Sequence, residues 1–212
     1  MKTSRLGLLE TQTMDILSKA ELSKFKHETL KKGCILYSDF VKIIIFKSGS
    51  AKLSFFEDGE EFIIYHLQKN NITILDDTCA IEILEDSEIY SIETQNIEEM
   101  LQNHEFTKGL YQTMLNITLL QRQIIKSILF EDAKGRISSF LIELANEQDL
   151  KQNGYRYVFL PFSVKILSSF VGLKRQSAST AFNELIKEDV IRKITPHEFL
   201  IIDYERLQSY TN

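Results

Sequence analysis

The hydrophobic period of the chain changes near Asn96, and this change limits the possible folds more than any other feature. Residues 34–92 hold short apolar runs rich in β-branched and aromatic residues, with Asp58-Gly59 between two of them. An Asp-Gly pair between apolar runs is a strong hairpin signal. Over residues 106–130, apolar residues recur every three or four positions, as in an amphipathic helix. We therefore expect an antiparallel β-roll followed by helices.

The run KIIIFKSGSAKLSFFEDGEEFIIYHL is predicted to hold three β-rich segments, with breaks at Ser48-Gly49-Ser50 and at the Asp-Gly pair. Shorter strands are expected in ITIL, TCAIEIL and EIYSIE, and a short helix within residues 11–30. The β-branched and aromatic content of these pieces favours strands over helices.

The helix expected over residues 106–130 has two apolar stripes. The first repeats at alternating spacings of four and three, which is typical of a coiled-coil seam. It consists of Leu110, Met114, Ile117, Gln121, Ile124 and Ile128. The second stripe, made of Leu115, Leu119 and Ile125 or Leu129, is expected to rest on the roll. Two apolar faces favour a homodimer over the alternative, a single buried helix in a monomer.

Gly172 separates two further predicted helices. A sharp turn between packed helices favours glycine, which accepts a positive φ without steric cost. Ala178 and Ala181 lie on the inward face of the second helix, where small side chains let two helices approach closely. Ser163 is a candidate N-cap of the first helix, whereas Lys174 is a poor N-cap for the second. The stretch predicts a helix-turn-helix.

The outer face of the second helix carries hydrogen-bonding residues without an acid among them: Lys174, Arg175, Gln176, Ser177, Ser179, Thr180 and Asn183. Such residues contact base edges and phosphates, with Arg suited to guanine and Gln to adenine. A solvated polar face is the alternative.

Downstream, VIRKI and EFLIID predict a hairpin, the wing of a winged helix, with Arg192 and Lys193 available to phosphates. Upstream, Asp132 is a candidate N-cap of the helix AKGRISSFLIELANE.

Composition indicates a folded protein without bulk attraction to nucleic acid. The chain is 43% hydrophobic and has a net charge of −5, so a nucleic-acid surface must be local. No apolar run approaches the length of a membrane span, and the N-terminus lacks a signal-peptide pattern, so we expect a cytoplasmic protein. Cys34 and Cys79 are too few for a disulfide framework or a thiolate metal site.

The chain resembles the Crp/Fnr family of bacterial transcription regulators over nearly its full length. SGSAKLSFFEDGEEFIIYHL resembles the family's sensor roll, FEDAKGRISSFLIELA the junction after its dimerisation helix, and LPFSVKILSSFVGLKRQSASTAFNELIKEDVI its DNA-reading motif. The resemblance implies an α+β fold with an antiparallel β-roll of the cyclic-nucleotide-binding type (jelly roll) over residues 1–105, a dimerisation helix over 106–131 and a winged helix-turn-helix over 132–212. It also implies a homodimer on a palindromic operator in double-stranded DNA, with RNA polymerase as a partner and no enzymatic activity.

The sequence departs from the family pattern in the reading helix. Family members often carry a Glu and, four residues later, an Arg, where this chain has Gln176 and Thr180. The preferred half-site is therefore expected to differ from those of the best-known members.

The expected sensor roll also departs from the family. Cyclic-nucleotide binding there uses a glycine-rich phosphate cassette with an Arg, yet no glycine occurs between Gly59 and Gly109 and no arginine between Arg5 and Arg122. Asn70-Asn71 stands where the family has a Gly-Asp turn, and Asn tolerates the left-handed conformation that such a turn needs. The turn is expected to persist without the phosphate pocket, so cyclic AMP is not expected.

Other effectors stay open. The iron-sulfur branch of the family has cysteines near its N-terminus, which are absent from residues 1–33. No metal or cofactor is predicted, with haem as an alternative through His27, His66 or His104. Redox or nitrosative stress, sensed by Cys34 or Cys79, and constitutive DNA binding are further alternatives.

Two other functions are weighed against DNA binding. One is an effector-binding or scaffold protein that keeps the fold without binding DNA, because residues 131–212 hold 11 Lys or Arg against 11 Asp or Glu. The other is a small β-barrel metalloenzyme, which needs His or Glu ligands at short spacing. The four histidines are isolated from one another along the chain, and no catalytic residue is predicted.

Overall fold

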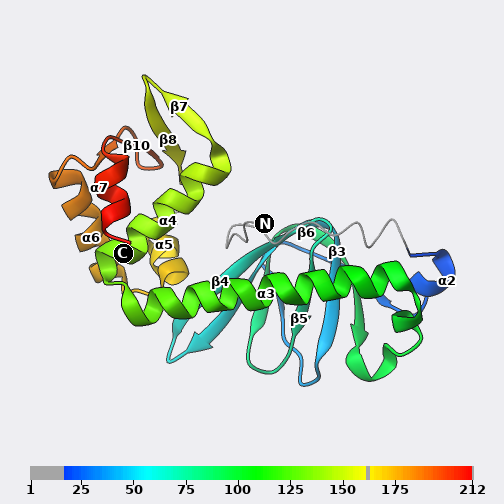
Figure 1. Cartoon of the computed structure of the whole chain (residues 1–212). Helices are drawn as coiled ribbons and strands as arrows, with labels where there is room; N and C mark the ends of the chain where they lie inside the picture. The colour runs from blue at the N-terminus through cyan, green and yellow to red at the C-terminus, as the bar shows by residue number, and fades with distance from the viewer. Residues whose placement is uncertain (1–16, 161–162, 212) are drawn as a thin grey trace. The chain divides into compact units, whose positions relative to one another are not determined.

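The computed structural model describes residues 17–160 and 163–211 of an α+β protein (Figure 1). Its contacts form two compact units, the first ending at Arg122 and the second beginning at Gln123. This division falls inside the long helix α3 (His104–Phe130). From the sequence, we expect this helix to be a separate segment between two domains. The helix itself begins and ends within two residues of its predicted bounds.

An antiparallel roll makes up the first unit. Its elements are α2 (Lys19–Leu22), β1 (Lys26–Leu30), β2 (Ile35–Leu36), β3 (Lys42–Glu57), β4 (Glu60–Gln68), β5 (Ile72–Leu75), β6 (Ala80–Glu93) and the 3-10 helices η1 (Thr94–Asn96) and η2 (Met100–Gln102). Strand β3 is central, because it pairs with β4, β5 and β6, while β1 and β2 pair with β6. The short helix expected early in the chain is α2, and the part of that prediction before residue 17 lies outside the described residues.

The strands are longer than predicted. Asp58 and Gly59 form the β3–β4 turn with φ of 50° and 77°, as expected for a two-residue hairpin. The break predicted at Ser48-Gly49-Ser50 is wrong: β3 continues through it, with register irregularities against β6. Bulges absorb extra residues while both flanks keep their ladder. AIEIL, the last five residues of TCAIEIL, and EIYSIE likewise belong to one strand, β6.

Two positions with a positive φ, one within a strand and one in a turn, show why their residues are needed. Gly49 has a φ of 84°, and a Cβ added there would lie 2.6 Å from the carbonyl oxygen of Asp86 on β6. A side chain would therefore push β3 and β6 apart. Asn70 adopts a φ of 66° between β4 and β5, which confirms that an asparagine supports the left-handed turn expected there.

The inward face of α3 differs from the predicted one. Phe106 is fully buried in a core cluster with Ile43, Ile45 and Ile72, and its ring meets Phe25 edge-on at 6.2 Å. This anchor sets the rotation of the helix about its axis. The inward positions that follow at helical spacing are Gly109, Thr113, Asn116 and Leu120.

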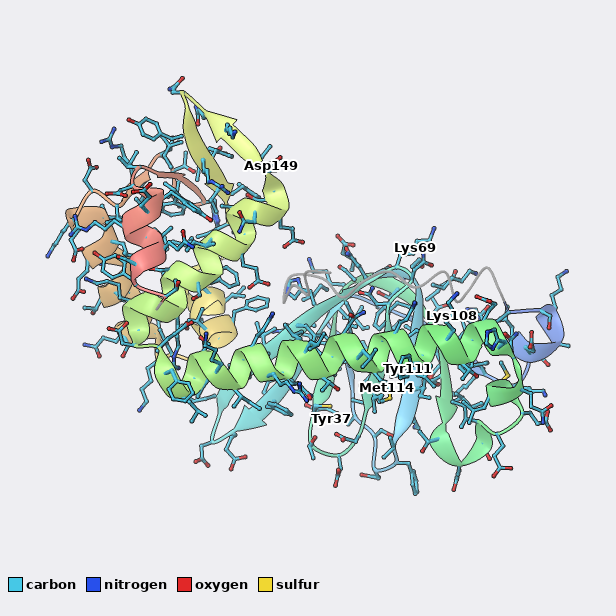
Figure 2. All side chains as sticks on the ribbon, in the orientation of Figure 1. Tyr37, Lys69, Lys108, Tyr111, Met114 and Asp149 are labelled. Carbon is cyan, nitrogen blue, oxygen red and sulfur yellow. The ribbon has the colours of Figure 1, made fainter. Side chains whose placement is uncertain are left out.

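The second apolar stripe is consequently not against the roll. Leu115 and Leu119 are each 45% exposed, so the prediction that they rest on the roll is wrong. Among the exposed apolar residues of α3, six form a band that we call the outer stripe: Tyr111, Met114, Leu115, Ile125, Ile128 and Leu129. Figure 2 labels Tyr111 and Met114 on the helix.

The coiled-coil seam predicted from the spacing is divided by this rotation. Met114, Gln121 and Ile128 are exposed, whereas Ile124 is 7% exposed and Leu110 packs against the core cluster. Ile117 is intermediate. Half of the predicted seam thus contributes to packing within the chain.

The second unit combines helices with a small antiparallel sheet. Its elements are α4 (Ala133–Gln148), β7 (Leu150–Gln152), β8 (Tyr155–Phe159), α5 (Val164–Val171), α6 (Arg175–Lys187), β9 (Ile191–Lys193), β10 (Glu198–Ile201) and α7 (Tyr204–Ser209). The strand order is β7-β8-β10-β9. Asp132 caps α4 as predicted, because its Oδ1 accepts a hydrogen bond from the Gly135 amide at 2.7 Å.

Aromatic pairs fill the core of this unit. Phe140 on α4 lies 5.7 Å from Phe170 on α5, between ring centroids. Phe182 on α6 meets Phe199 on β10 at 4.9 Å and nearly at right angles, a favoured aromatic geometry. The core thus joins α6 to both the sheet and the other helices. None of the helices in the described part of the chain has the length and apolar character needed to cross a bilayer.

Candidate DNA-binding site

The turn between α5 and α6 has the geometry expected from its glycine. Gly172 has φ 64° and ψ 41°, and its amide and that of Leu173 donate to the Ser168 carbonyl. Ala178 and Ala181 are buried where α6 packs on the neighbouring helices. The helix-turn-helix predicted from this stretch is confirmed.

The predicted reading residues all face solvent. Lys174, Arg175, Gln176, Ser177, Ser179, Thr180 and Asn183 are exposed. Within the described part of the chain, none of these side chains makes a hydrogen bond or an ion pair. Their donors and acceptors are therefore available to a ligand at no cost in broken internal contacts.

The N-terminus of α6 has no side-chain cap. Lys174 is the N-cap residue, with φ −64° and ψ 143°, and provides no capping hydrogen bond, as the sequence predicts. Ser163 is the N-cap of α5, as predicted, but its hydroxyl does not cap the helix either. Uncapped amides at a helix N-terminus suit a phosphate oxygen.

The predicted wing is present as the antiparallel pair β9 and β10. Lys193 and Arg192 are both exposed. Arg192 Nη2, however, donates to the Asp189 carboxylate at 3.0 and 3.2 Å. Lys193 is thus the freer of the two predicted phosphate contacts.

Arg136 is a residue of this site that the sequence did not single out. From α4 it donates to four carbonyl oxygens: Ile128 at 2.8 Å, Glu131 at 3.2 Å, Gly172 at 3.0 Å and Val171 at 3.5 Å. One guanidinium therefore joins the end of α3, the start of α4 and the turn before α6. Its donors satisfy carbonyls that helix ends leave unpaired.

An open hollow of about 530 Å³ lies between the start of α4 and the exposed side of α6, and we call it the α4–α6 hollow. Its lining consists of Asp132, Ala133, Lys134, Gln176, Ser177, Thr180, Ala181 and Glu184. Three predicted reading residues thus share a wall with charged groups that the sequence did not single out. Glu184 follows Thr180 by four residues on α6 itself, whereas Asp132 and Lys134 reach this wall through the packing of α4 on α6.

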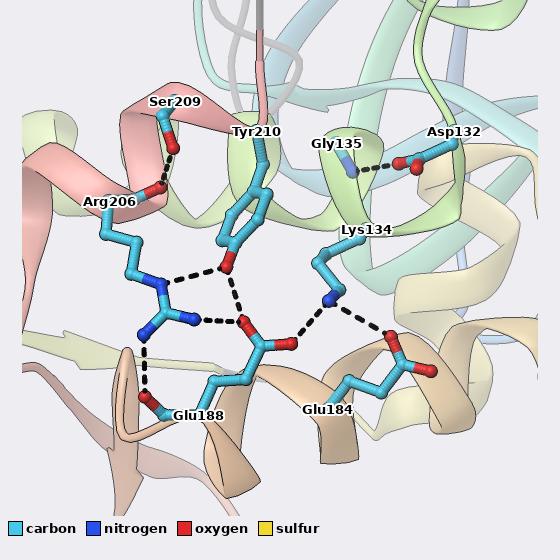
Figure 3. A network of polar contacts seen from close by, with 8 residues as sticks. All are labelled: Asp132, Lys134, Gly135, Glu184, Glu188, Arg206, Ser209 and Tyr210. Atoms are coloured by element: carbon cyan, nitrogen blue, oxygen red, sulfur yellow. Dashed lines mark hydrogen bonds and ion pairs between the residues drawn. The ribbon is translucent and has the colours of Figure 1, made fainter.

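Figure 3 shows the polar network beside this hollow. Lys134 Nζ lies 2.6 Å from Glu188 Oε1 and 3.2 Å from Glu184 Oε2. Arg206 Nη2 lies 2.9 Å from Glu188 Oε2, to which the Tyr210 hydroxyl also donates. The hydrogen bond to Glu188 is the main cause of a raised pKa of Lys134. The network links α4, α6 and α7.

The histidines considered as haem ligands lie in different surroundings. His66 on β4 is largely buried, and burial followed by the charge of Lys52 lowers its pKa to about 4. His27 on β1 stacks on Tyr90 with ring centroids 4.7 Å apart. His104 is exposed at the start of α3. Within residues 17–160 and 163–211, no three His, Cys, Asp or Glu side chains gather as a metal site would require.

The two cysteines are both free thiols. The carbonyl of Cys34 accepts a hydrogen bond from the Ile83 amide within β6, whereas Cys79 directly precedes that strand. Burial is the main cause of a raised pKa of Cys79, and the charge of Asp76 raises it further. A raised pKa reduces the thiolate fraction on which reactivity depends.

A small hollow opens on the roll beside Lys26, Lys42 and Tyr37, with Ile44, Leu75 and Ile89 among its lining. Its volume is about 130 Å³, whereas ligand pockets measure roughly 300 to 1,000 Å³. It is too small to enclose a nucleotide.

Comparison with known proteins bears on both units. Residues 135–210 match the family described as the Crp-like helix-turn-helix domain. No curated protein matches the chain. A variant of CooA from Carboxydothermus hydrogenoformans is similar in structure, with a TM-score of 0.83, 20% identity and 96% of each chain covered.

Two further solved structures share the fold. A protein from Eubacterium rectale, assigned to the crp/fnr family of transcriptional regulators, has a TM-score of 0.67 at 17% identity and covers 94% of this chain and 97% of its own. The c-di-GMP responsive global regulator CLP of Xanthomonas campestris has a TM-score of 0.66 at 15% identity and covers 89% and 97%. At such identities the likeness is one of fold.

Proposed function

Because residues 135–210 form a Crp-like helix-turn-helix domain in a chain with the fold of the Crp/Fnr transcription regulators, we propose that this protein regulates transcription by binding duplex DNA as a homodimer. In this proposal α6 enters the major groove, and the wing and the start of α6 meet phosphates.

One observation carries the proposal. Seven exposed, acid-free positions on α6 and at its N-cap have no partner within the described chain, directly after the glycine turn that orients the helix. Arg175 suits guanine O6 and N7, and Gln176 suits adenine N6 and N7. If this polar face were only solvated, it would not need to follow a helix-turn-helix turn. A DNA-reading face does need that position.

The homodimer is proposed to form through the outer stripe of α3. Its six apolar residues are exposed over nearly five turns of one helix, and an apolar band of that length is typical of an association surface. Two copies would then present two α6 helices, which predicts a palindrome with half-sites about 34 Å apart.

For the signal we propose an effector other than a cyclic nucleotide. The hollow beside Lys26, Tyr37 and Lys42 on the roll measures only about 130 Å³, and the sequence has no arginine between Arg5 and Arg122 to pair a phosphate. A buried phosphate without such donors would be costly. Nitric oxide and redox stress are the first signals to test, with haem content measured in the same samples.

Selection of binding sites from random duplex DNA tests the proposal, using the full chain with and without a nitric oxide donor. We expect an enriched palindrome whose binding weakens steeply with salt. The variant Arg175→Ala should enrich a motif with one relaxed base pair in each half-site. Failure to enrich any duplex sequence under all conditions would contradict the proposal.

A second candidate, a scaffold or effector-binding protein without DNA binding, is favoured by one observation. Several cations near α6 already have acidic partners, as Arg192 has Asp189 and Lys134 has Glu184. A gel shift with the DNA upstream of the protein's own gene separates the two candidates. Transcription in vitro with RNA polymerase then tests whether the bound protein acts on initiation.

A further inference from the structure

The α4–α6 hollow places acids beside the surface that we propose for DNA. Its charged residues are Asp132, Lys134 and Glu184, a formal balance of one cation against two anions. The Lys134 side chain is 19% exposed, whereas Glu184 is 49% exposed. A phosphate approaching this wall therefore meets the Glu184 carboxylate more readily than the Lys134 ammonium.

The three acids near Lys134 differ in their other partners. Asp132 accepts a hydrogen bond from the Gly135 amide. Glu188 accepts from Arg206 and Tyr210 as well as from Lys134. Glu184 contacts Lys134 alone among the described residues. Glu184 is thus the carboxylate that the network needs least, and together with Asp132 it lines the hollow.

We propose that Glu184 weakens the attraction of this wall for DNA phosphates, both by its own charge and by offsetting the charge of Lys134, and so limits how tightly the protein holds DNA of any sequence. The inference rests on the proposed function, since it requires α6 to meet DNA. Phosphate contacts are independent of sequence. A group that suppresses them therefore lowers the affinity for operator and non-operator DNA alike.

The variant Glu184→Gln tests this inference in the full chain. It keeps the size of the side chain and removes one negative charge, while Glu188 still holds Lys134. We expect affinity for operator and non-operator duplex alike to rise roughly threefold, the scale of one surface charge interaction. The salt dependence, as the slope of log K against log [salt], should steepen by up to about 0.9, as for one additional phosphate contact.

Glu205→Gln is the matched control. Glu205 is exposed on α7 and does not line the hollow, yet its replacement changes the net charge of the protein equally. Lys134→Gln should change affinity in the opposite direction, and Lys134→Gln combined with Glu184→Gln should return it towards the wild-type value. Thermal unfolding of each variant shows whether the fold is retained.

The outcomes separate this inference from the proposed function. A rise in affinity for both duplexes together with a steeper salt slope for Glu184→Gln, but not for Glu205→Gln, supports it. Equal behaviour of the two variants, with wild-type protein bound to its operator, overturns the inference alone. Absence of DNA binding by the wild-type protein overturns both.

Discussion

Arg136 on α4 donates a hydrogen bond from Nη1 to the carbonyl oxygen of Gly172, 36 residues later, at 3.0 Å. The same guanidinium donates to Ile128 of α3 through Nη2. A charged donor on α4 thus ties the turn that orients α6 to the end of α3. Hydrogen bonds that involve a charged group are stronger than neutral ones.

Replacing Arg136 should therefore destabilise the second unit. Arg136→Lys keeps the charge but cannot reach several carbonyls at once, because a lysine lacks the planar fork of the guanidinium. We expect a loss of roughly 2 kcal/mol in the free energy of unfolding, the scale of hydrogen bonds to charged groups. Urea unfolding measures it. The control Arg175→Lys, at an exposed position without a partner, should unfold like the wild type, and equal stability of the two variants would contradict the clamp.

Base and phosphate contacts should respond differently to mutation. Arg175→Ala is expected to cost about 1 to 3 kcal/mol at one base pair of each half-site and to relax selectivity there. Lys193→Ala on the wing should weaken binding to all sequences and lower the salt slope by about 1. Quantitative binding to a set of single-base operator variants distinguishes them. Undiminished selectivity of Arg175→Ala would show that another residue reads that base.

The glycine at the β3 bulge should be far less replaceable than the glycine at the hairpin. Gly49 and Gly59 both have positive φ, 84° and 77°, so Ala costs about 1 to 2 kcal/mol of backbone strain at either. At Gly49 a Cβ would also meet the Asp86 carbonyl oxygen at 2.6 Å, whereas at Gly59 the space is open. The melting temperature of Gly49→Ala should be well below that of Gly59→Ala. Equal melting temperatures would refute the close approach of Gly49 to the Asp86 carbonyl.

His66 should make the roll less stable in mild acid. Its pKa is lowered to about 4 by burial and by Lys52, while the unfolded chain has an ordinary value of about 6.5. Below pH 6.5 the unfolded state therefore binds more protons, and stability falls as the pH decreases from about 6.5 towards 4, by up to about 1.4 kcal/mol per pH unit. Urea unfolding at pH 7, 6 and 5 measures this slope. A His66→Gln variant should lose most of this dependence of stability on pH. An unchanged slope in that variant would show that another group causes it.

A charge in the outer stripe should separate the proposed dimer. Ile125 is 55% exposed on α3, and an ionised residue buried in an apolar interface is costly. Sedimentation should show Ile125→Glu as a monomer at concentrations where the wild type is a dimer. Phe40→Glu, at an exposed apolar position on the roll, is the control and should remain a dimer. If Ile125→Glu sediments as the wild type does, the stripe is not the interface.

Local features could be predicted because they depend on a few residues that are adjacent in sequence. Asp58-Gly59 forms its hairpin and Gly172 its turn with the expected positive φ, since these conformations depend on the residue itself and on the adjacent chain. The exposed face of α6 follows from helical spacing once Ala178 and Ala181 are placed inward. The candidate reading residues required no knowledge of the rest of the molecule.

Other features depend on contacts between distant residues. The spacing of apolar residues on α3 allows several rotations of the helix, and the burial of Phe106 in the roll selects the one that exposes Leu115. Gly49 ends no strand, because the pairing of β3 with β6 continues on both sides of it.

The sequence by itself determined the turns at Asp58-Gly59 and Gly172, the change from strands to helices along the chain, and which polar side chains α6 presents. Only the tertiary structure decided which face of α3 is covered and which charges surround α6. Lys134 meets Glu188 across 54 residues of chain, and no local pattern encodes such a pair. Turns and helix faces follow from torsional preference and periodicity over a few residues, whereas helix rotation and ion pairing follow from the packing of elements remote in sequence.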